Sequence, residues 1–96
     1  MDLKQLIKSN RDEILRIARR HGAENVRIFG SVARGDAGPD SDLDLLVEVG
    51  AARTPFFPGG LIADLEALLG CKVEVATPDA LHDRIRSRVL EEAVPL

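Results

Sequence analysis

The stretch FGSVARG, residues 29–35, and the stretch SDLDLLV, residues 41–47, decide the fold of this chain. Val26 to Phe29 is apolar enough to form a buried strand, and Gly30-Ser31 then predicts a tight turn whose glycine lets the backbone approach a ligand. Because a serine at the start of a short helix leaves its hydroxyl and nearby N–H groups facing outward, the turn can cradle phosphate. The residues from Arg34 to Asp40 include two glycines and a proline, which predicts a loop before the second strand.

Two acidic residues, Asp42 and Asp44, stand at the start of that second strand. Side chains alternate along a strand, so carboxylates two residues apart point the same way and repel each other unless a cation lies between them. Mg²⁺ in nucleotide sites takes few protein oxygens and completes its shell with water and phosphate. A D-x-D pair by itself is more often a solvated strand end, and a Gly-Ser pair is more often a plain turn. The conjunction of the two motifs favours a site for a nucleoside triphosphate.

Residues 30–35 and 41–44 together resemble the signature of the DNA polymerase beta-like nucleotidyltransferase superfamily. Because the chain is short, it most resembles the minimal nucleotidyltransferase branch of that superfamily, found in prokaryotes as antitoxins paired with HEPN-domain toxins. The resemblance covers nearly the whole chain and implies the nucleotidyltransferase fold. It also implies ATP as the substrate and Mg²⁺ as the cofactor. Two ions are expected, because two metals clamp the attacking and leaving oxygens in such reactions.

A third carboxylate is expected on the strand that follows the intervening helix, as in the superfamily. That strand offers one acid, Glu74, which lies between Val73 and Val75 and so points away from their apolar face. If this strand pairs beside the second strand, Glu74 shares a face with Asp42 and Asp44. Aspartate is the usual third acid in the superfamily, so a glutamate here leaves open whether it binds metal or acts as a general base. The alternative is an exposed strand acid paired with Lys72 or an arginine.

The remaining pattern predicts the order helix, strand, turn-helix, strand, helix, strand, helix. The expected helices run from Leu3 to Ile7, from Asn10 to a stop at Gly22, over 31–34, over 61–69 and onward from Thr77-Pro78; the expected strands cover 26–29, 43–49 and 71–76, and 94–96 is a short tail. This order predicts an α/β (α+β) fold with a small mixed three-stranded sheet, covered by helices mainly on one face.

Two apolar features carry further expectations about packing. Leu46 lies on the aspartate side of its strand, so a helix further along the chain is expected to cover it. Phe56 and Phe57 occur in the loosest stretch, residues 50–60. Packing against the small core is favoured for them, over a lid or a platform on which a base stacks.

The composition excludes several classes of protein. The chain has 96 residues, of which 45% are hydrophobic and 30% charged, which indicates a single globular domain over residues 1–96. A net charge of −3 argues against general nucleic-acid binding. No apolar run reaches the length of a membrane span, and no secretory signal is seen. The single cysteine, Cys71, cannot form an internal disulfide, and the expected compartment is the cytoplasm.

The leading hypothesis is a Mg²⁺-dependent nucleotidyltransferase. The phosphates of ATP lie at Gly30 and Ser31 with help from Arg34, whose guanidinium suits phosphate. An acceptor hydroxyl near Glu74 attacks the α-phosphate, and pyrophosphate leaves. The chain shows no domain to bind the acceptor, which favours a macromolecule presented from outside. The resemblance implies that this acceptor is a tyrosine of a HEPN-type ribonuclease toxin, neutralised by transfer of AMP.

Two alternatives stay open. In the first, the chain is a non-catalytic antitoxin or binding module that neutralises its partner by complex formation. In the second, it is a transferase acting on a small molecule such as an aminoglycoside, which the lack of an acceptor domain makes the least favoured. Mg²⁺-dependent turnover separates the enzyme from the binding module, whose partner binding would be unaffected by Asp44→Asn.

Overall fold

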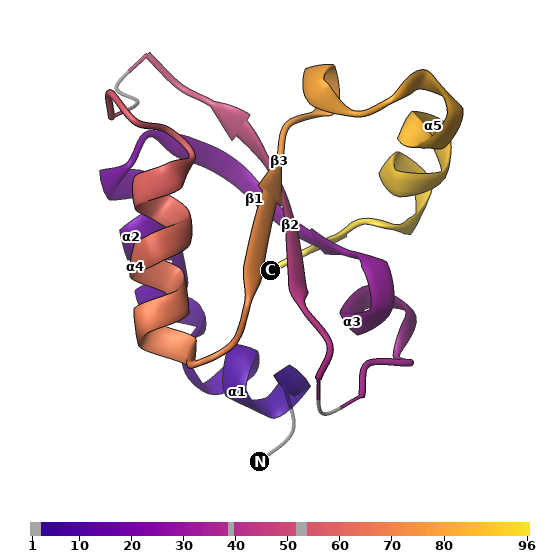
Figure 1. Ribbon diagram of the computed structural model, residues 1–96, viewed down its shortest axis with the longest axis horizontal. Helices are drawn as coiled ribbons and strands as arrows, with labels where there is room; N and C mark the ends of the chain where they lie inside the picture. Colours follow the sequence, from indigo (N-terminus) through magenta and orange to yellow (C-terminus); the bar gives the residue numbers. More distant parts are fainter. Residues whose placement is uncertain (1–2, 39, 52–53) are drawn as a thin grey trace.

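A mixed four-stranded sheet with the strand order β3-β2-β1-β4 forms the centre of the computed structural model, which describes residues 3–38, 40–51 and 54–96 (Figure 1). The strands are β1 (Ala23–Phe29), β2 (Leu43–Val49), β3 (Val73–Ala76) and β4 (Val94–Pro95). β1 runs antiparallel to both β2 and β4, whereas β2 and β3 are parallel. The parallel pair is joined through a helix, which is the connection that parallel strands require.

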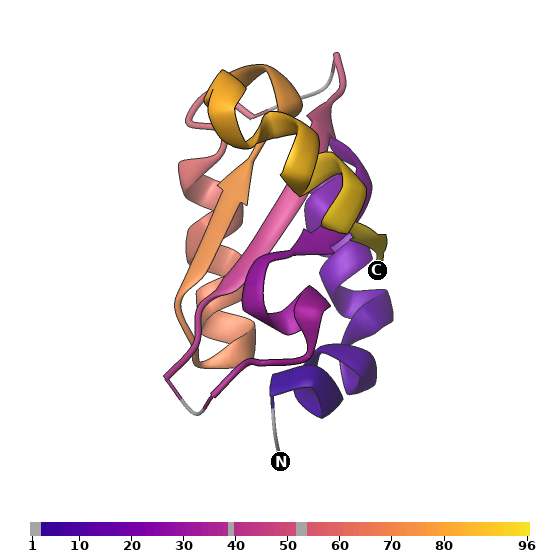
Figure 2. The ribbon, with the colours of Figure 1, turned by 90° about the vertical axis from the view of Figure 1, so that its right-hand side faces the viewer.

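Helices lie on both faces of this sheet (Figures 1 and 2). The helices are α1 (Leu3–Ser9), α2 (Arg11–Arg20), α3 (Gly30–Arg34), α4 (Gly59–Leu69) and α5 (Asp83–Glu92), with a short 3₁₀ helix at Pro78–Ala80. In Figure 1, α2 and α4 lie side by side on one face of the sheet, with α1 below them in the view, and α5 lies on the other face. The predicted α+β class with a mixed sheet is therefore confirmed, and most helical cover is on one face as expected.

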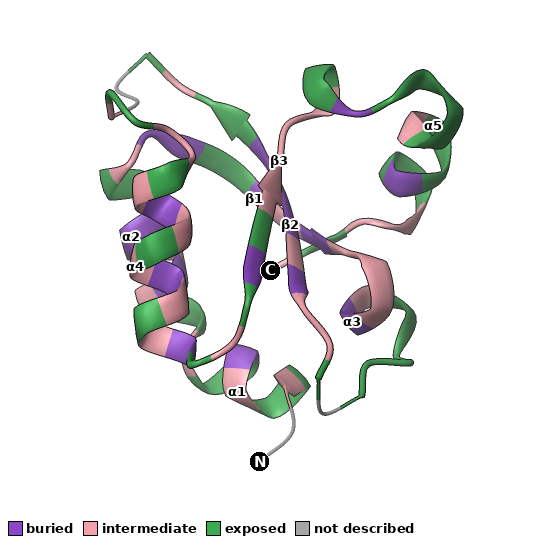
Figure 3. Ribbon diagram, viewed as in Figure 1, coloured by how far each residue is buried: buried purple, intermediate pink, exposed green. Residues whose placement is uncertain are grey.

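Buried residues lie along most of β2 (Figure 3), and they belong to core clusters on the two faces of the sheet. Leu43, Leu45 and Val47 are fully buried in the main cluster under α2 and α4. Leu46 points to the opposite face, where it is fully buried in a smaller cluster with Leu81 and Val89. Because Val89 belongs to α5, the expectation that a later helix covers Leu46 is confirmed.

The C-terminal residues form a strand, and the prediction of a tail was wrong. Val94 pairs with Ile28 and Pro95 with Arg27, so β4 lies along the outer edge of β1. The sheet consequently has four strands instead of the expected three. A two-residue strand has no periodicity of its own, because only the long-range contact with its partner defines it.

The last helix begins later than predicted. Thr77-Pro78 starts only the three-residue 3₁₀ helix, after which Leu81 and His82 are extended and α5 begins at Asp83. The side chain of His82 caps α5, since its Nδ1 accepts the backbone N–H of Arg84 at 3.2 Å. A proline suits the first turn of any helix, so its presence could not predict how far this helix would run.

Other boundaries shift by a few residues. β1 begins at Ala23, three residues early, and contains a register irregularity between Glu24 and Arg27, where Asn25 has a φ of 49°. β3 begins at Val73 and is two residues shorter than predicted.

The two neighbouring phenylalanines have different environments. Phe57 packs against the main core, which confirms the core expectation for this residue. Phe56 is 84% exposed, so the same expectation was wrong for it. Within the three described segments, no helix is long and apolar enough to cross a membrane.

Candidate functional site

A groove of about 380 Å³ lies beside the junction of β1 and α3, between the start of β2 and helix α5. It is lined by Phe29, Gly30, Ser31, Arg34, Asp42, Asp44, Ile85, Arg88, Val89 and Glu92. The structure thus brings five of the six residues singled out in the sequence into one concave surface. The sixth, Glu74, is exposed and does not belong to the lining.

Strand register places the Gly30 turn against Asp44. Phe29, the last residue of β1, is the partner of Asp44 across the antiparallel pair, so the residue after it must turn beside that carboxylate. Gly30 has a φ of +76°, a backbone conformation that side chains other than glycine rarely adopt. A Cβ atom at this position would overlap Oδ2 of Asp44. Glycine is therefore required here both by the backbone conformation and by the approach of the carboxylate.

The three acids lie on one side of the sheet, and two of them act on the pKa of the third. Asp44 and Glu74 are paired residues of the parallel strands β2 and β3, and Asp42 lies just before β2 on the same side. Burial raises the pKa of Asp44 to about 6, and the negative charges of Glu74 and Asp42 and a hydrogen bond with Glu74 act in the same direction. The positive charge of Arg34 opposes this rise in the pKa but does not cancel it. The expectation that Glu74 shares the aspartate face agrees with this arrangement.

The donor set fits a hard divalent cation that is shared with a phosphate ligand. Within the described residues, none of the ion pairs involves Asp42, Asp44 or Glu74, so no side-chain cation neutralises their repulsion by direct contact. In that same part of the chain, no three His, Cys, Asp or Glu side chains gather closely enough to hold an ion by themselves. Mg²⁺ commonly takes one or two carboxylates and fills its remaining positions with water and substrate phosphate. Asp42 and Asp44 provide that kind of incomplete site.

Arg34 reaches the groove but is engaged by acids. Its Nη1 donates to Oε1 of Glu92 at 2.6 Å, and its Nε donates to Oδ2 of Asp36 at 3.3 Å. These hydrogen bonds, led by the one with Glu92, raise the pKa of Arg34. Since about half of the Arg34 side chain is exposed, a phosphate could compete with both carboxylates for the guanidinium.

The helix α5 supplies groove residues that the sequence interpretation missed. Ile85, Arg88 and Glu92 are spaced three and four residues apart and therefore share one helical face. The sequence alone did not place Arg88 in the site, but its side chain lines the groove. Arg88 is exposed and makes no hydrogen bond or ion pair with another residue of the described segments. The i, i+3, i+7 spacing was the available signal, but it could not show which surface the helix would face.

Comparison with known proteins identifies the family. The family described as nucleotidyltransferase domain matches residues 11–96, which contain all six predicted site residues. The chain belongs to the nucleotidyltransferase domain family. This membership and its named relatives make it an enzyme with nucleotidyltransferase activity.

Curated relatives of this nucleotidyltransferase come from archaea. It is 38% identical over 82 residues to a Methanocaldococcus jannaschii protein provisionally named as a protein adenylyltransferase, covering 85% of this chain and 88% of the relative. It is 31% identical over 93 residues to the protein adenylyltransferase MntA of Thermococcus cleftensis, covering 97% and 91% of the two chains.

Solved structures agree with the nucleotidyltransferase fold. A structure described provisionally as a minimal nucleotidyltransferase has a TM-score of 0.86 and 46% identity, and the match covers 100% of this chain and 97% of that chain. A toxin–antitoxin structure with AMP-PNP has a TM-score of 0.74 at 18% identity, covering 90% of this chain and 71% of that chain. The second likeness concerns the fold alone.

Proposed function

We propose that this nucleotidyltransferase transfers AMP from ATP to a tyrosine hydroxyl of a HEPN-type ribonuclease toxin and thereby acts as its antitoxin. The observation that carries the proposal is the meeting of the Gly30-Ser31 turn with Asp42 and Asp44 in one groove. The names of the relatives support a protein as the acceptor, since two of them are called protein adenylyltransferases. Structures of the same fold are described as toxin–antitoxin complexes, among them MntA–HpeT.

Polar groups on the groove wall would bind the triphosphate. The backbone at Gly30 and the hydroxyl of Ser31 face the triphosphate, and the guanidinium of Arg88 is free to bind its oxygens. Arg34 joins them by exchanging Glu92 and Asp36 for phosphate oxygens. Phe29 and Ile85 give the groove apolar surface on which the nucleoside can pack.

The acids of the site fit Mg²⁺. Asp42 and Asp44 would hold it, and Glu74 is the third acid, paired with Asp44 across β2 and β3. Bound Mg²⁺ supplies neutralisation of the charge on the phosphate oxygens. Asp44 must give up its proton to serve as a ligand. With its pKa raised to about 6, Asp44 is still mostly ionised at neutral pH, and it takes up a proton as the pH falls toward 6 and below.

The reaction is an in-line displacement at phosphorus. The acceptor oxygen forms a bond to the α-phosphorus of ATP while the bond from that phosphorus to the bridging oxygen breaks, releasing pyrophosphate. The hydroxyl proton passes to the carboxylate of Glu74, which is exposed and therefore accessible to an acceptor from outside. Positioning and charge neutralisation supply most of the rate enhancement.

Label transfer tests the proposal. The enzyme is incubated with Mg²⁺, a purified HEPN-domain toxin of the same genome and ATP labelled at the α-phosphate, with the host lysate as a second acceptor source. We expect a labelled toxin band with wild type and none with Asp44→Asn. ATP labelled at the γ-phosphate is the matched control and should give no band, because that phosphate leaves in pyrophosphate. Toxin binding by both proteins without any label transfer would instead establish the non-catalytic antitoxin.

A further inference from the structure

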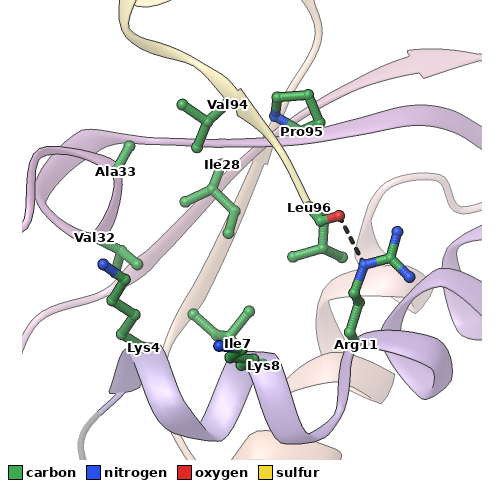
Figure 4. Close-up of a pocket in the computed structure, with 10 residues that line it drawn as sticks. All are labelled: Lys4, Ile7, Lys8, Arg11, Ile28, Val32, Ala33, Val94, Pro95 and Leu96. Atoms are coloured by element: carbon green, nitrogen blue, oxygen red, sulfur yellow. Dashed lines mark hydrogen bonds between the residues drawn. The ribbon is translucent and has the colours of Figure 1, made fainter.

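A second groove, of about 460 Å³, lies between α1 and the β1–β4 edge of the sheet (Figure 4). We call it the α1 groove; it is lined by residues 4, 7, 8, 11, 28, 32, 33 and 94–96. Ile7, Ile28 and Val32 make its floor and are between 4% and 8% exposed. Val94 on β4 is 44% exposed and forms an accessible apolar wall.

The rim of the α1 groove is positively charged. Lys4, Lys8 and Arg11 stand along α1 and the start of α2, and Figure 4 shows them on the same side of the groove as Ile7. Arg11 holds the C-terminal segment in place, because its Nε donates to the backbone oxygen of Leu96 at 2.9 Å. Lys4 and Lys8 are exposed, and neither forms a hydrogen bond or an ion pair with another described residue.

Charge complementarity identifies the occupant. None of the residues that line the α1 groove is an aspartate or glutamate, although the chain as a whole carries a net charge of −3. A matching ligand therefore presents apolar side chains to the floor and carboxylates to the two free ammonium groups. An apolar floor does not suit a phosphate backbone. A second copy of this chain would fit only if it offered an acidic, apolar segment of its own.

The α1 groove is joined by shared elements to the groove of the candidate site, lined by Gly30, Asp42 and Asp44 among others, which we call the catalytic groove. Helix α3 places Ser31 and Arg34 in the catalytic groove, while Val32 and Ala33, on the same five-residue helix, line the α1 groove. On the other side, α5 carries Arg88 and Glu92 and leads directly into Val94. A chain segment seated in the α1 groove would consequently lie one short helix away from Asp42 and Asp44.

We propose that the α1 groove docks an acidic, apolar segment of the acceptor protein and so presents that protein's hydroxyl to the catalytic groove. The inference rests on the proposed function and adds to it the surface that presents the acceptor. Because the acceptor docks beside the catalytic groove and not within it, the catalytic groove stays open to ATP while the acceptor is bound.

Charge reversal at one lysine tests the docking surface. Titration calorimetry measures binding of the purified HEPN-domain toxin to wild type, to Lys8→Glu and to the matched control Arg84→Glu. Arg84 is likewise exposed, and its side chain makes no hydrogen bond or ion pair with another described residue. We expect at least tenfold weaker binding for Lys8→Glu, less than a twofold change for Arg84→Glu, and unchanged ATP affinity in both. Equal binding by the two variants would overturn the docking proposal.

Site-specific crosslinking identifies the occupant. A photoreactive benzoylphenylalanine at position 8 is irradiated with the toxin present, and position 84 serves as the control. We expect the position-8 crosslink to map to a toxin segment containing both carboxylates and apolar residues. A crosslink to a second copy of this chain, to a basic segment or to nothing while the complex still forms would overturn the proposal.

The two proposals fail differently. If α-phosphate label reaches the toxin equally well with wild type and Lys8→Glu at low toxin concentration, the proposed function stands and the docking surface is refuted. If wild type neither labels nor binds the toxin, the identity of the partner in the proposed function is refuted, and toxin docking with it. Binding that depends on Lys8 without any label transfer supports the docking surface and refutes the catalytic role.

Discussion

Gly30 and Asp44 approach each other so closely that no side chain fits between the turn and the carboxylate. The approach follows from strand register, because Asp44 is paired with Phe29 and the chain must turn immediately afterwards. The same glycine has a positive φ, so the turn and the acid are fixed relative to each other by backbone geometry. A phosphate bound at the turn and a cation bound at Asp44 would therefore be held in one arrangement.

Gly30→Ala should reduce the rate of AMP transfer strongly and the stability of the fold only moderately. The added Cβ must displace the Asp44 carboxylate, and misplacement of a catalytic group by about 1 Å can cost about 100-fold in rate. Gly70→Ala is the matched control, since Gly70 has a φ of +68° but nothing within 4 Å of the added atom. Both variants should lose about 1–2 kcal/mol of unfolding free energy from the left-handed conformation. Label transfer and urea denaturation measure the two effects, and equal transfer by both variants would contradict the role of this contact.

Asp44→Asn should stabilise the protein at alkaline pH. The pKa of Asp44 is raised in the fold from 3.8 to about 6, so the folded protein binds this proton more tightly than the unfolded chain does. Stability is consequently lost as the pH rises through this interval, and an uncharged asparagine avoids that loss. We expect the Tm of Asp44→Asn to exceed that of wild type at pH 8 and to match it more closely below pH 4. Asp79→Asn removes an exposed charge and serves as the control; a Tm difference that is independent of pH would refute the linkage.

Arg88→Ala should weaken nucleotide binding. Arg88 lines the catalytic groove and forms no ion pair with another described residue, and a hydrogen bond to a charged group contributes about 1.5–3 kcal/mol. We expect at least a tenfold rise in the Kd for a non-hydrolysable ATP analogue, measured by titration calorimetry. Arg84→Ala alters the same helix outside the groove and should leave the Kd unchanged. If both substitutions raise the Kd equally, Arg88 acts only through the overall positive charge of the helix and not through contact with the nucleotide.

Glu92→Gln should strengthen nucleotide binding. Glu92 accepts a 2.6 Å hydrogen bond from Arg34, and a triphosphate must displace this carboxylate to use the guanidinium. About half of the Arg34 side chain is exposed, so solvent screens the pair and the expected fall in the Kd is modest, at most about fivefold. The neighbouring Glu91→Gln removes the same charge from an exposed position and measures the general electrostatic contribution. Weaker binding by Glu92→Gln would mean that Glu92 orients Arg34 instead of withholding it.

The adjacent phenylalanines form a natural pair for testing the core. Phe57→Ala removes a ring packed against the main cluster and should cost about 1–3 kcal/mol of unfolding free energy, less than a fully buried ring because it is only partly covered. Phe56→Ala should change stability by less than about 0.5 kcal/mol, because Phe56 is 84% exposed. Neither residue lines the catalytic groove, so transfer should be unchanged in both. A selective loss of nucleotide binding in Phe56→Ala would revive the idea of a base-stacking platform.

The local sequence predicted the elements that carry their own periodicity. β2 lies at Leu43–Val49 as expected, because its alternation distinguishes the Leu45 face from the Asp44 face. The Gly-Ser turn and the grouping of Gly30, Ser31, Arg34 and the two aspartates were also predicted, since strand, turn and strand are close in sequence.

The unpredicted features depend on long-range contacts. β4 depends on contacts such as that of Val94 with Ile28, 66 positions earlier in the chain, and α5 is held over the groove by contacts such as that of Val89 with Leu46. Arg88 and Glu92 entered the groove through that packing, and no local pattern could reveal it. The exposure of Phe56 beside the packed Phe57 likewise depends on how the loop meets the core.

The two-residue strand β4 and the small cluster around Leu46 have a consequence for amide exchange. They anchor α5 together with the Arg34–Glu92 hydrogen bond, whereas β1 and β2 are held on both sides and bury the main core. Segments with few buried contacts open at lower free energy than the rest of a fold. We therefore expect the amides of α5 to take up deuterium while those of β2 remain protected. Local opening of α5, which forms one wall of the catalytic groove, would then let the ligand enter and leave.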